Sequence, residues 1–520
     1  MRDKVNRKDK KRKRRIRKLI SEKKVKEALT LASNEDIYLL FEIGLSAWEE
    51  ENHELVERIF KRVLEFEPDN AGAWLNRGVA LGHLENYEEA ITCYDEVLKR
   101  NFCNVEVLYN KGIALQELEK FDEAVTCFDE AIKSNPLYAD AWFSKGVALG
   151  NLGNHAGAVE CFDKATEIDP HCPHVWFNKG LALKFCKKHD KAIECFDEAL
   201  EIIPDYADAL HNKGVALQSL GKYTKAIDCF NRAAEIDPDN PITWCCKGIA
   251  LANVEKYTEA LPCFDTALKI NPDNADVWSD KGVVLEQLGK YTEAIHCYDK
   301  ALKMNPDNAV TWLNKGVSLD SLEKHDEAVS CYDKAIQIDP YCVQAWLNKG
   351  ITLGDLGSCD GALLCFDEAL KMDPDNADAW YCKGVVLGRL RKYGEALICY
   401  DEAVTRDLDN ALMWLEKGRT LQHLGKNREA LICFDKSLKI DPEDADTWYN
   451  KGVVLILLGN HLKAVHCFDG TIQRDPDYAP AWYNKGVALE NLGKHVEAVK
   501  CFDKAVKIDP ALLKYWKGKR

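Results

Sequence analysis

Long apolar runs are missing from this 520-residue chain. No uninterrupted hydrophobic stretch approaches the roughly 20 residues that a helix needs to cross a bilayer. The basic N-terminal stretch is not followed by the apolar segment of a signal peptide. We therefore expect a soluble, cytoplasmic protein without a membrane span, in which the cysteines are reduced.

Catalytic and ligand-cradling motifs are also missing. The sequence contains no nucleophile–base motif, no glycine-rich phosphate loop and no helix-borne metal motif. Cys245 adjoins Cys246, and His171, Cys172 and His174 share a turn, but neither cluster has a second ligand pair at the spacing of a structural zinc site. We therefore predict that the protein is not an enzyme and binds no metal, no cofactor and no small-molecule substrate.

What the sequence has instead is one 34-residue pattern, repeated head to tail without insertion or deletion. A fixed period of this size is typical of an array in which each unit buries its apolar face only against its neighbours. We expect a basic N-terminal arm at 1–18, a partial helical cap at 19–36, fourteen repeats at 37–512, and a truncated tail at 513–520 in which Trp516 restarts the pattern. The copies begin at 37, 71, 105, 139, 173, 207, 241, 275, 309, 343, 377, 411, 445 and 479.

Charge is divided unevenly along the chain. Residues 1–18 contain twelve Lys or Arg against Asp3 and Asp9, a net +10, so the rest of the chain carries −25 of the total of −15. The arm has no aromatic residue for base stacking, so its only signal is charge. A solvated tail and contact with nucleic acid, an acidic partner or an anionic membrane surface are all open interpretations.

Within one repeat, numbered here from position 1 to position 34, the apolar spacing predicts two helices. Helix A has recurring residues at positions 3, 4, 7, 10, 11 and 14, and helix B has a small residue at 20, an aromatic at 24 and apolar residues at 27, 28 and 30. A glycine near position 15 often separates the helices, and Pro at position 32 ends helix B.

Three columns of residues indicate how the helices pack. Glycine fills position 8 in all fourteen copies and Ala fills position 20 in thirteen, which predicts a close approach of helices A and B. Eleven of the thirteen Trp lie at position 4, where we expect them in the core. Thirteen of the 21 Cys lie at position 23, and equivalent residues of stacked hairpins are farther apart than the ~7 Å that a disulfide allows, which predicts partly buried thiols.

Small residues at 8 and 20, an aromatic at 24 and Pro at 32 in a 34-residue helix–turn–helix unit resemble the tetratricopeptide repeat (TPR) family. The resemblance implies an all-α fold, a right-handed superhelix (alpha-solenoid) of antiparallel helix pairs, in which helix A lines a concave groove and helix B lies mostly outside. It also implies a non-catalytic scaffold that binds extended segments of a protein or peptide partner in that groove. The alternative function is a nucleic-acid-associated assembly factor that uses the basic arm.

Two charged columns depart from the family pattern. Position 7, commonly Leu in the family, is Lys in twelve copies, and position 25 is Asp in twelve. We predict that the two columns pair within a repeat, as Lys111 with Asp129, with their stems packed and their charged ends in contact. Pairing with the adjacent repeat and two independently solvated columns are the alternatives.

Asn at position 6 is the candidate binding residue. An amide has a donor and an acceptor, so it can pair with the backbone of an extended peptide. The column is similar to the asparagine ladder in the superhelix of the O-linked N-acetylglucosamine transferase, and the similarity covers the repeats only. An ordinary polar residue on a solvent-facing helix is the alternative. Family members that clamp a C-terminal carboxylate use Lys at position 5 and Asn at position 9, where this chain is mostly apolar, so we expect backbone and apolar contacts instead. The predicted peptide-binding residues are Asn76, Asn110, Asn178, Asn212, Asn314, Asn348, Asn450 and Asn484.

Overall fold

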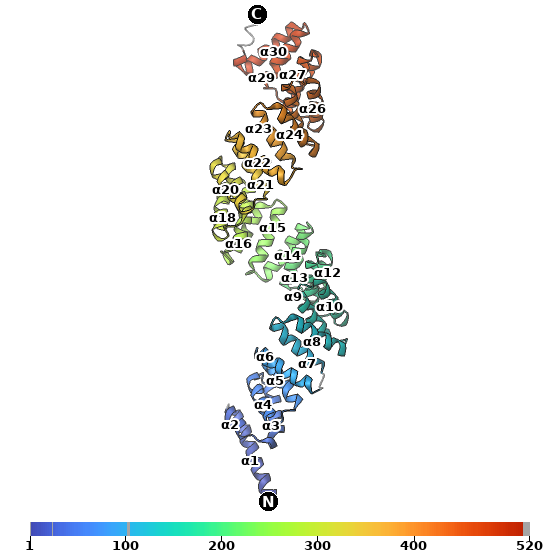
Figure 1. The fold of residues 1–520 in the computed structure, drawn as a ribbon, viewed down its shortest axis with the longest axis vertical. Helices are drawn as coiled ribbons and strands as arrows, with labels where there is room; N and C mark the ends of the chain where they lie inside the picture. Colours follow the sequence, from blue (N-terminus) through green and yellow to red (C-terminus); the bar gives the residue numbers. More distant parts are fainter. Residues whose placement is uncertain (1, 23, 101–103, 513–520) are drawn as a thin grey trace. The chain divides into compact units, whose positions relative to one another are not determined.

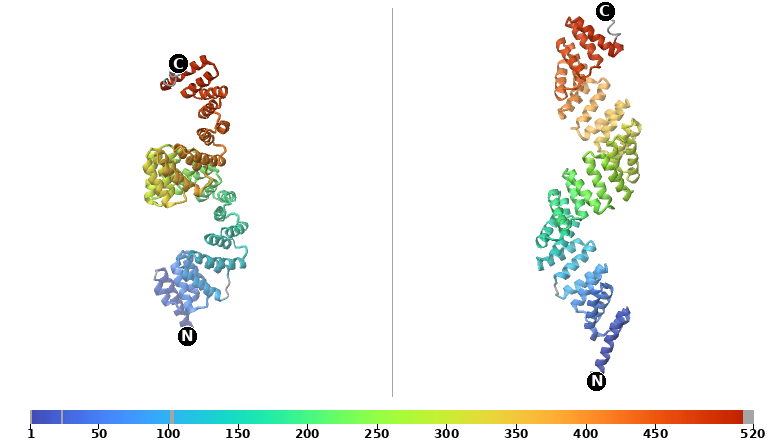
Figure 2. Two further views of the ribbon diagram at one scale, coloured as in Figure 1. Left: turned by 45° about the horizontal axis from the view of Figure 1, so that its top comes forward. Right: turned by 180° about the vertical axis from the view of Figure 1, so that it is seen from behind.

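The computed structural model describes residues 2–22, 24–100 and 104–512, with side chains from Lys8 onward. These residues belong to two compact units, Met1–Ile270 and Asn271–Arg520. Each unit is a row of antiparallel helix pairs that follow one another along the chain, as Figures 1 and 2 show. Within a unit, each B helix packs against the A helix of its own pair and against the A helix of the next pair. The expected all-α solenoid of helix–turn–helix repeats is therefore confirmed in both units.

In the first unit, the A helices begin at the residues where the repeat pattern begins. They are α3 (Ile37–Glu49), α5 (Ala71–His83), α7 (Val105–Glu117), α9 (Ala139–Asn151), α11 (Pro173–Phe185), α13 (Ala207–Ser219) and α15 (Pro241–Asn253). The B helices are α4 (His53–Phe66), α6 (Tyr87–Lys99), α8 (Phe121–Ser134), α10 (His155–Ile168), α12 (His189–Ile202), α14 (Tyr223–Ile236) and α16 (Tyr257–Ile270).

The second unit continues with the same helix lengths. Its A helices are α17 (Ala275–Gln287), α19 (Ala309–Ser321), α21 (Val343–Asp355), α23 (Ala377–Arg389), α25 (Ala411–His423), α27 (Ala445–Leu457) and α29 (Ala479–Asn491). Its B helices are α18 (Tyr291–Met304), α20 (His325–Ile338), α22 (Cys359–Met372), α24 (Tyr393–Arg406), α26 (Asn427–Ile440), α28 (His461–Arg474) and α30 (His495–Ile508), and a short 3-10 helix η2 (Pro510–Leu512) follows. The expected tail at 513–520, with Trp516, lies outside the described residues.

The turn between helices A and B has the same backbone conformation in every copy. The residue at position 15 has a positive φ in all fourteen repeats. Half of these residues are glycines, such as Gly289 (φ 71°), and the others are Glu, Lys or Arg, such as Glu323 (φ 60°). The left-handed conformation costs a residue with a Cβ about 1–2 kcal/mol. The repeat therefore requires this turn even where the sequence carries no glycine to signal it.

The invariant glycine at position 8 makes room for an aromatic ring. A Cβ placed on Gly112 would lie 2.5 Å from Cε1 of Phe128, and one on Gly350 would lie 2.6 Å from Cε1 of Phe366. The expectation of close packing at this position is right. Its partner is the ring at position 24 of helix B, which is buried between the two helices.

The Trp side chains at position 4 hydrogen-bond to the loop that precedes their repeat. The indole Nε1 of Trp346 donates to the carbonyl oxygen of Pro340 at 3.1 Å, and Trp278 donates to Pro272 at 3.0 Å. All eleven Trp at position 4 make this bond to the residue at position 32 that precedes them. Most of these rings are half-buried, so the column is partly core and partly a link between neighbouring repeats.

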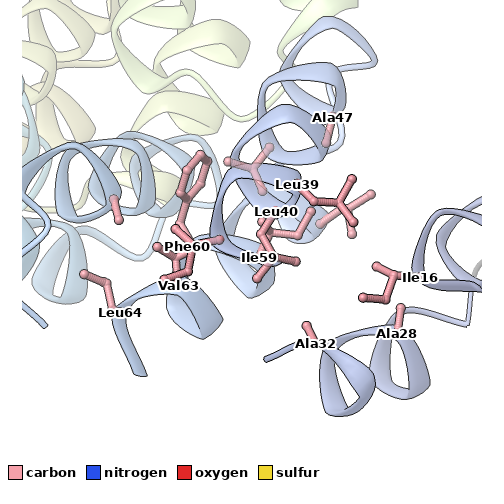
Figure 3. Packing of buried hydrophobic residues seen from close by; sticks show 14 of the residues in the cluster. Ile16, Ala28, Ala32, Leu39, Leu40, Ala47, Ile59, Phe60, Val63 and Leu64 are labelled. Atoms are coloured by element: carbon pink, nitrogen blue, oxygen red, sulfur yellow. The ribbon is translucent and has the colours of Figure 1, made fainter. Parts of the chain in front are cut away.

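The N-terminal segment is a helix that packs on the first repeat. Helix α1 (Arg2–Ser21) is followed by α2 (Val25–Leu31) and a 3-10 turn η1 (Asn34–Asp36). Ile16 is fully buried in one cluster with residues of α2, α3 and α4, and Figure 3 shows it beside Ala28 and the Leu39 side chain of α3.

An ion pair also holds α1 in place. The Arg12 guanidinium contacts the fully buried carboxylate of Asp36, with Nε 2.8 Å from Oδ2. From Lys8 onward, α1 packs on the array through Ile16 and pairs with it through Arg12, whereas Lys10, Lys11, Arg14 and Arg15 stay exposed. The expected boundary between residues 18 and 19 falls inside α1.

Candidate functional site

The eight predicted binding asparagines all lie on A helices and are all half-buried. The first unit carries Asn76, Asn110, Asn178 and Asn212 on α5, α7, α11 and α13, and the second carries Asn314, Asn348, Asn450 and Asn484 on α19, α21, α27 and α29. A position three residues along an A helix is on the same face. Within each unit, the A-helix face that contains positions 6 and 9 is the surface to which this column belongs, and we call it the A face.

Several of these asparagines use one amide hydrogen inside their own helix. Nδ2 of Asn178 donates to the carbonyl of His174 at 2.8 Å, and Nδ2 of Asn450 donates to the carbonyl of Asp446 at 2.7 Å. Asn76 makes the same bond four residues back along α5, at 2.8 Å. A side-chain amide has two donor hydrogens and an acceptor oxygen. This anchored geometry fixes the amide plane while its oxygen and second hydrogen can bond outside the helix.

Other members of the column bind a neighbouring side chain. Nζ of Lys184 donates to Oδ1 of Asn212 at 2.6 Å, and Nδ2 of Asn484 donates to the hydroxyl of Tyr449 at 3.0 Å. Both bonds cross from one repeat to the next. Nδ2 of Asn212 also donates to the carbonyl of Asp208 in its own helix at 2.9 Å, and Oδ1 of Asn348 accepts from Nε2 of Gln344, one turn earlier, at 2.8 Å. The asparagine column thus has a structural part and a part with free bonding capacity, a division that the sequence did not indicate.

An aliphatic column runs beside the asparagines. Position 9 is Val, Ile or Leu in every copy except the one with Arg419, and none of these aliphatic side chains is fully buried. In the second unit, Val283 is 36% exposed and Ile351 is 37% exposed. Because Ile351 lies three residues after Asn348 on α21, the A face presents an amide and an apolar side chain together.

Acidic side chains line the start of the same helices. Position 2 is an exposed Glu or Asp in six copies. In α17 a further carboxylate, Asp280, takes the place of the asparagine at position 6, and burial together with the charge of Asp276 raises its pKa to about 6. Burial also raises the pKa of Glu286 at the end of α17, against hydrogen bonds from Ser318 and Tyr298 that lower it. The A face is therefore apolar, amide-bearing and acidic. The position 2 residues are Glu106, Asp140, Asp208, Asp276, Asp378 and Asp446.

The Lys and Asp columns pair between repeats, so the prediction of pairing within a repeat is wrong. Nζ of Lys111 lies 2.7 Å from Oδ1 of Asp95 in the preceding repeat, whereas Asp129 is bound by Lys145 of the following repeat at 2.5 Å. Helix A packs between the B helix of its own repeat and that of the repeat before, and the lysine is directed to the earlier one. The two aspartates lie at similar separations from the lysine, sixteen and eighteen residues for Lys111, so the sequence could not choose between them.

The cysteine column consists of buried thiols. The thirteen cysteines at position 23 are buried, and burial raises the pKa of thiols such as Cys161 and Cys195 to about 11, so they stay protonated at neutral pH. Over the described residues, no three His, Cys, Asp or Glu side chains come together as a metal site would require. Within the same residues, no helix has the length and apolar character needed to cross a bilayer.

Family models match most of the chain. A tetratricopeptide repeat model matches 71–101, 173–206, 207–240, 241–274 and 479–512, and a second tetratricopeptide repeat model matches 109–173. A model described as the C-terminal domain of cilia and flagella-associated protein 70 matches 274–473. Among curated proteins, none matches the chain.

Three solved structures are similar to parts of the chain. YrrB, described as a TPR protein with an unusual peptide-binding site, is 29% identical over 36% of this chain and 97% of its own, with a TM-score of 0.33. The Cut9–Hcn1 hetero-tetramer of the APC/C is 16% identical over 89% of this chain and 98% of its own, with a TM-score of 0.39. Yeast Tom70 is 16% identical over 86% of this chain and 99% of its own, with a TM-score of 0.37.

Proposed function

This chain belongs to the tetratricopeptide repeat family, and from that premise we propose that it is a non-catalytic scaffold that binds an extended segment of a partner protein on its A face. The single observation that carries the proposal is the arrangement on α19 and α21. There, the half-buried Asn314 and Asn348 each lie one turn before an aliphatic side chain, Val317 or Ile351, on successive A helices. A repeating amide beside a repeating apolar side chain matches the alternation of backbone and side chain along an extended peptide.

The chemistry of the A face selects a class of partner. Its aliphatic column favours apolar side chains, and the exposed carboxylates at position 2 of six other A helices, among them the neighbouring α17 and α23, favour Lys or Arg over acidic side chains. The bound segment is therefore an extended stretch in which apolar and basic residues alternate. The asparagines hold the segment through its backbone, so they add affinity without reading sequence.

Binding of synthetic peptides to the full chain tests this proposal. Labelled peptides with alternating basic and apolar residues should show saturable binding by fluorescence anisotropy, and peptides with acidic residues in place of the basic ones should bind more weakly. The double variant Asn314→Ala with Asn348→Ala should raise Kd by about tenfold, since a hydrogen bond contributes about 0.5–1.5 kcal/mol. The matched control is Gln337→Ala with Thr405→Ala, which changes exposed polar residues on B helices. If the asparagine variant folds and its affinity for the peptide is unchanged, the asparagines do not contribute to binding.

The exposed side of α1 allows the alternative, nucleic acid binding, to be tested separately. Lys10, Lys11, Arg14 and Arg15 are exposed, whereas Ile16 packs into the first repeat. Changing these four basic residues to Gln removes the charge and leaves the packing of α1 intact. Salt-sensitive binding of single-stranded RNA by the native chain, lost in this variant, would favour the alternative. The same weak binding by both chains would exclude α1 as a nucleic acid site.

A further inference from the structure

Five successive B helices of the second unit each carry one exposed aliphatic side chain on the side away from their A helices. The buried residues of these helices lie at positions 20, 23, 24 and 27, whereas the exposed residues lie at positions 18 and 22, one turn apart on the opposite side. We call these five residues the outer ridge. They are Leu364 on α22 (66% exposed), Ile398 on α24 (61%), Ile432 on α26 (58%), Leu462 on α28 (69%) and Val496 on α30 (74%).

The repeat itself does not require an outer ridge. In the nine preceding copies, position 22 is Arg, Thr, Glu, Asp, Pro, His or Ser, and position 18 is Glu, Asp, Thr or Ala. Those copies build the same helix pairs with polar or small residues at these places. An apolar side chain on one helix surface is ordinary, but one on each of five successive helices is a pattern that indicates an interface.

Charge changes sign along the outer ridge. The position 25 aspartates are paired with lysines of the following A helices. The other charged residues give α22 and α24 a formal charge of −1 each, and α26 and α28 a formal charge of +2 each. The ridge thus has an acidic half and a basic half joined at α24 and α26, whose place in the unit is visible in Figure 1. The contributing residues are Asp360, Glu368 and Lys371 on α22; Glu395, Glu402 and Arg406 on α24; Arg428, Glu429, Lys436 and Lys439 on α26; and Lys463 and Arg474 on α28.

We propose that the outer ridge binds a second copy of this chain about a two-fold axis that passes between α24 and α26. A two-fold interface is self-complementary, so a residue that contacts a second residue on the partner is contacted by its counterpart in return. With the axis in this place, Ile398 packs on Ile432 of the partner subunit, and α22 faces α28. Each acidic helix then meets a basic helix.

The charge pattern sets the direction of the two chains. In the antiparallel arrangement, opposite charges meet where α22 faces α28 and where α24 faces α26, and Val496 on α30 lies beyond this four-helix contact. In a parallel arrangement, α22 would face α22 and α24 would face α24, which places like charges together and is disfavoured. Burial of the exposed aliphatic side chains supplies the attraction, and the charges select the orientation. Because the outer ridge lies on B helices, the dimer leaves the A faces of both copies available for the partner segment.

The mass of the full chain in solution tests the dimer. Sedimentation equilibrium should give twice the 58.8 kDa of one chain. The variant Ile398→Ser with Ile432→Ser should sediment with the mass of one chain, and its circular dichroism and Tm should stay close to those of the native chain because both side chains are mostly exposed. The matched control is Val310→Ser with Leu412→Ser, which changes two aliphatic residues of similar exposure (61% and 51%) at the start of A helices. The control should remain dimeric. A native chain that is monomeric at every concentration, or a ridge variant that stays dimeric, would overturn the proposal.

Charge exchange tests the orientation independently. One variant carries Asp360→Lys with Glu395→Lys, and the other carries Arg428→Glu with Lys463→Glu; all four native residues are exposed. Each variant alone should be monomeric, because like charges then meet across the axis. An equal mixture should form a heterodimer, because each variant restores the opposite charge to the other. A mixture that stays monomeric while both variants are folded, or variants that dimerise alone, would contradict the antiparallel two-fold arrangement.

Discussion

Lys349 binds Asp333 across the boundary between two repeats, with Nζ 2.5 Å from Oδ1. The lysine belongs to α21, and the aspartate belongs to α20 of the repeat before. The lysine stem also lies over Trp346 of its own helix, with Nζ 5.6 Å from the ring centroid. One side chain thus joins three parts of the array: the ring of its own repeat, the carboxylate of the preceding repeat, and, through Trp346, the loop at Pro340. The contact repeats along each unit and forms a ladder that ties neighbouring repeats together.

The ladder predicts coupling between repeats. In a double-mutant cycle, Lys349→Ala and Asp333→Ala should be coupled by about 0.5–1 kcal/mol, because Asp333 is partly exposed and water screens the pair. The control cycle pairs Lys349→Ala with Asp367→Ala, the aspartate of the same repeat, whose partner is Lys383. The control should show additive losses of unfolding free energy in urea. Coupling in the control cycle, with none in the first cycle, would show that the lysine pairs with the aspartate of its own repeat.

The turn at position 15 predicts opposite effects of two simple substitutions. Glu323→Gly should raise the free energy of unfolding by about 1 kcal/mol, because glycine adopts a positive φ without the steric cost paid by a residue with a Cβ. Gly289→Ala should lower it by a similar amount, and no heavy atom lies within 4 Å of the added Cβ, so the loss reports the backbone alone. Hydrogen exchange of α17 to α20 would locate both effects. If Glu323→Gly were destabilising, a side-chain contact of Glu323 would outweigh the backbone cost.

The helix pairs could be predicted from the sequence because their signals are local and repeated. The glycine at position 8 and the aromatic at position 24 are sixteen residues apart in every copy, as Gly350 and Phe366 are. Fourteen repetitions of this spacing predict the two helices and the turn between them. Contacts that cross repeats are different. The sequence places Lys111 as close to Asp95 as to Asp129, at sixteen and eighteen residues, and only the stacking of the helices decides which carboxylate it reaches.

The candidate site was predictable only in outline. Residue columns identified the A face, but the bonding state of each asparagine depends on its neighbours. Asn178 and Asn212 both donate to a carbonyl of their own helix, and Asn212 in addition accepts from Lys184 of the preceding repeat. Helix α1 was missed because its composition resembles a solvated arm. The signals that could have found it are Ile16 and Leu19, three residues apart on a basic helix, and the acidic Asp36 that Arg12 reaches.

Because an aromatic ring packs on the glycine at position 8, we predict that a methyl group added there destabilises the fold. The steric overlap with the ring should cost more than the better helix propensity of alanine contributes. Gly350→Ala should lower the free energy of unfolding by about 1–3 kcal/mol, because the new methyl group would overlap the Phe366 ring. Gly388→Ala on α23 is the matched control, since nothing lies within 4 Å of its added Cβ. The control should be stabilising by up to about 1 kcal/mol through helix propensity.

A second substitution shows whether the ring causes the loss. Combining Gly350→Ala with Phe366→Leu should cost less than the sum of the single losses, because the smaller side chain leaves space for the methyl group. Urea unfolding of the four chains measures the difference. Strictly additive losses would mean that the glycine is needed for a reason other than the ring.

The carboxylate of Asp280 predicts a pH dependence of stability. Its pKa in the folded chain is raised to about 6, first by burial and then by the charge of Asp276, whereas an unfolded Asp titrates near 3.9. The folded chain therefore holds a proton that the unfolded chain releases between about pH 4 and pH 6. The contribution of this group to stability falls as the pH rises through that window, by on the order of 1–2 kcal/mol.

Asp280→Asn should remove this part of the slope and make the chain more stable at pH 7, because eight other copies carry an amide at the same position. Urea unfolding at a series of pH values measures the slope, and the control Asp378→Asn, an exposed carboxylate at the start of α23, should leave it in place. A variant whose stability at pH 7 equals that of the native chain would show that the charged form of Asp280 is held by compensating contacts.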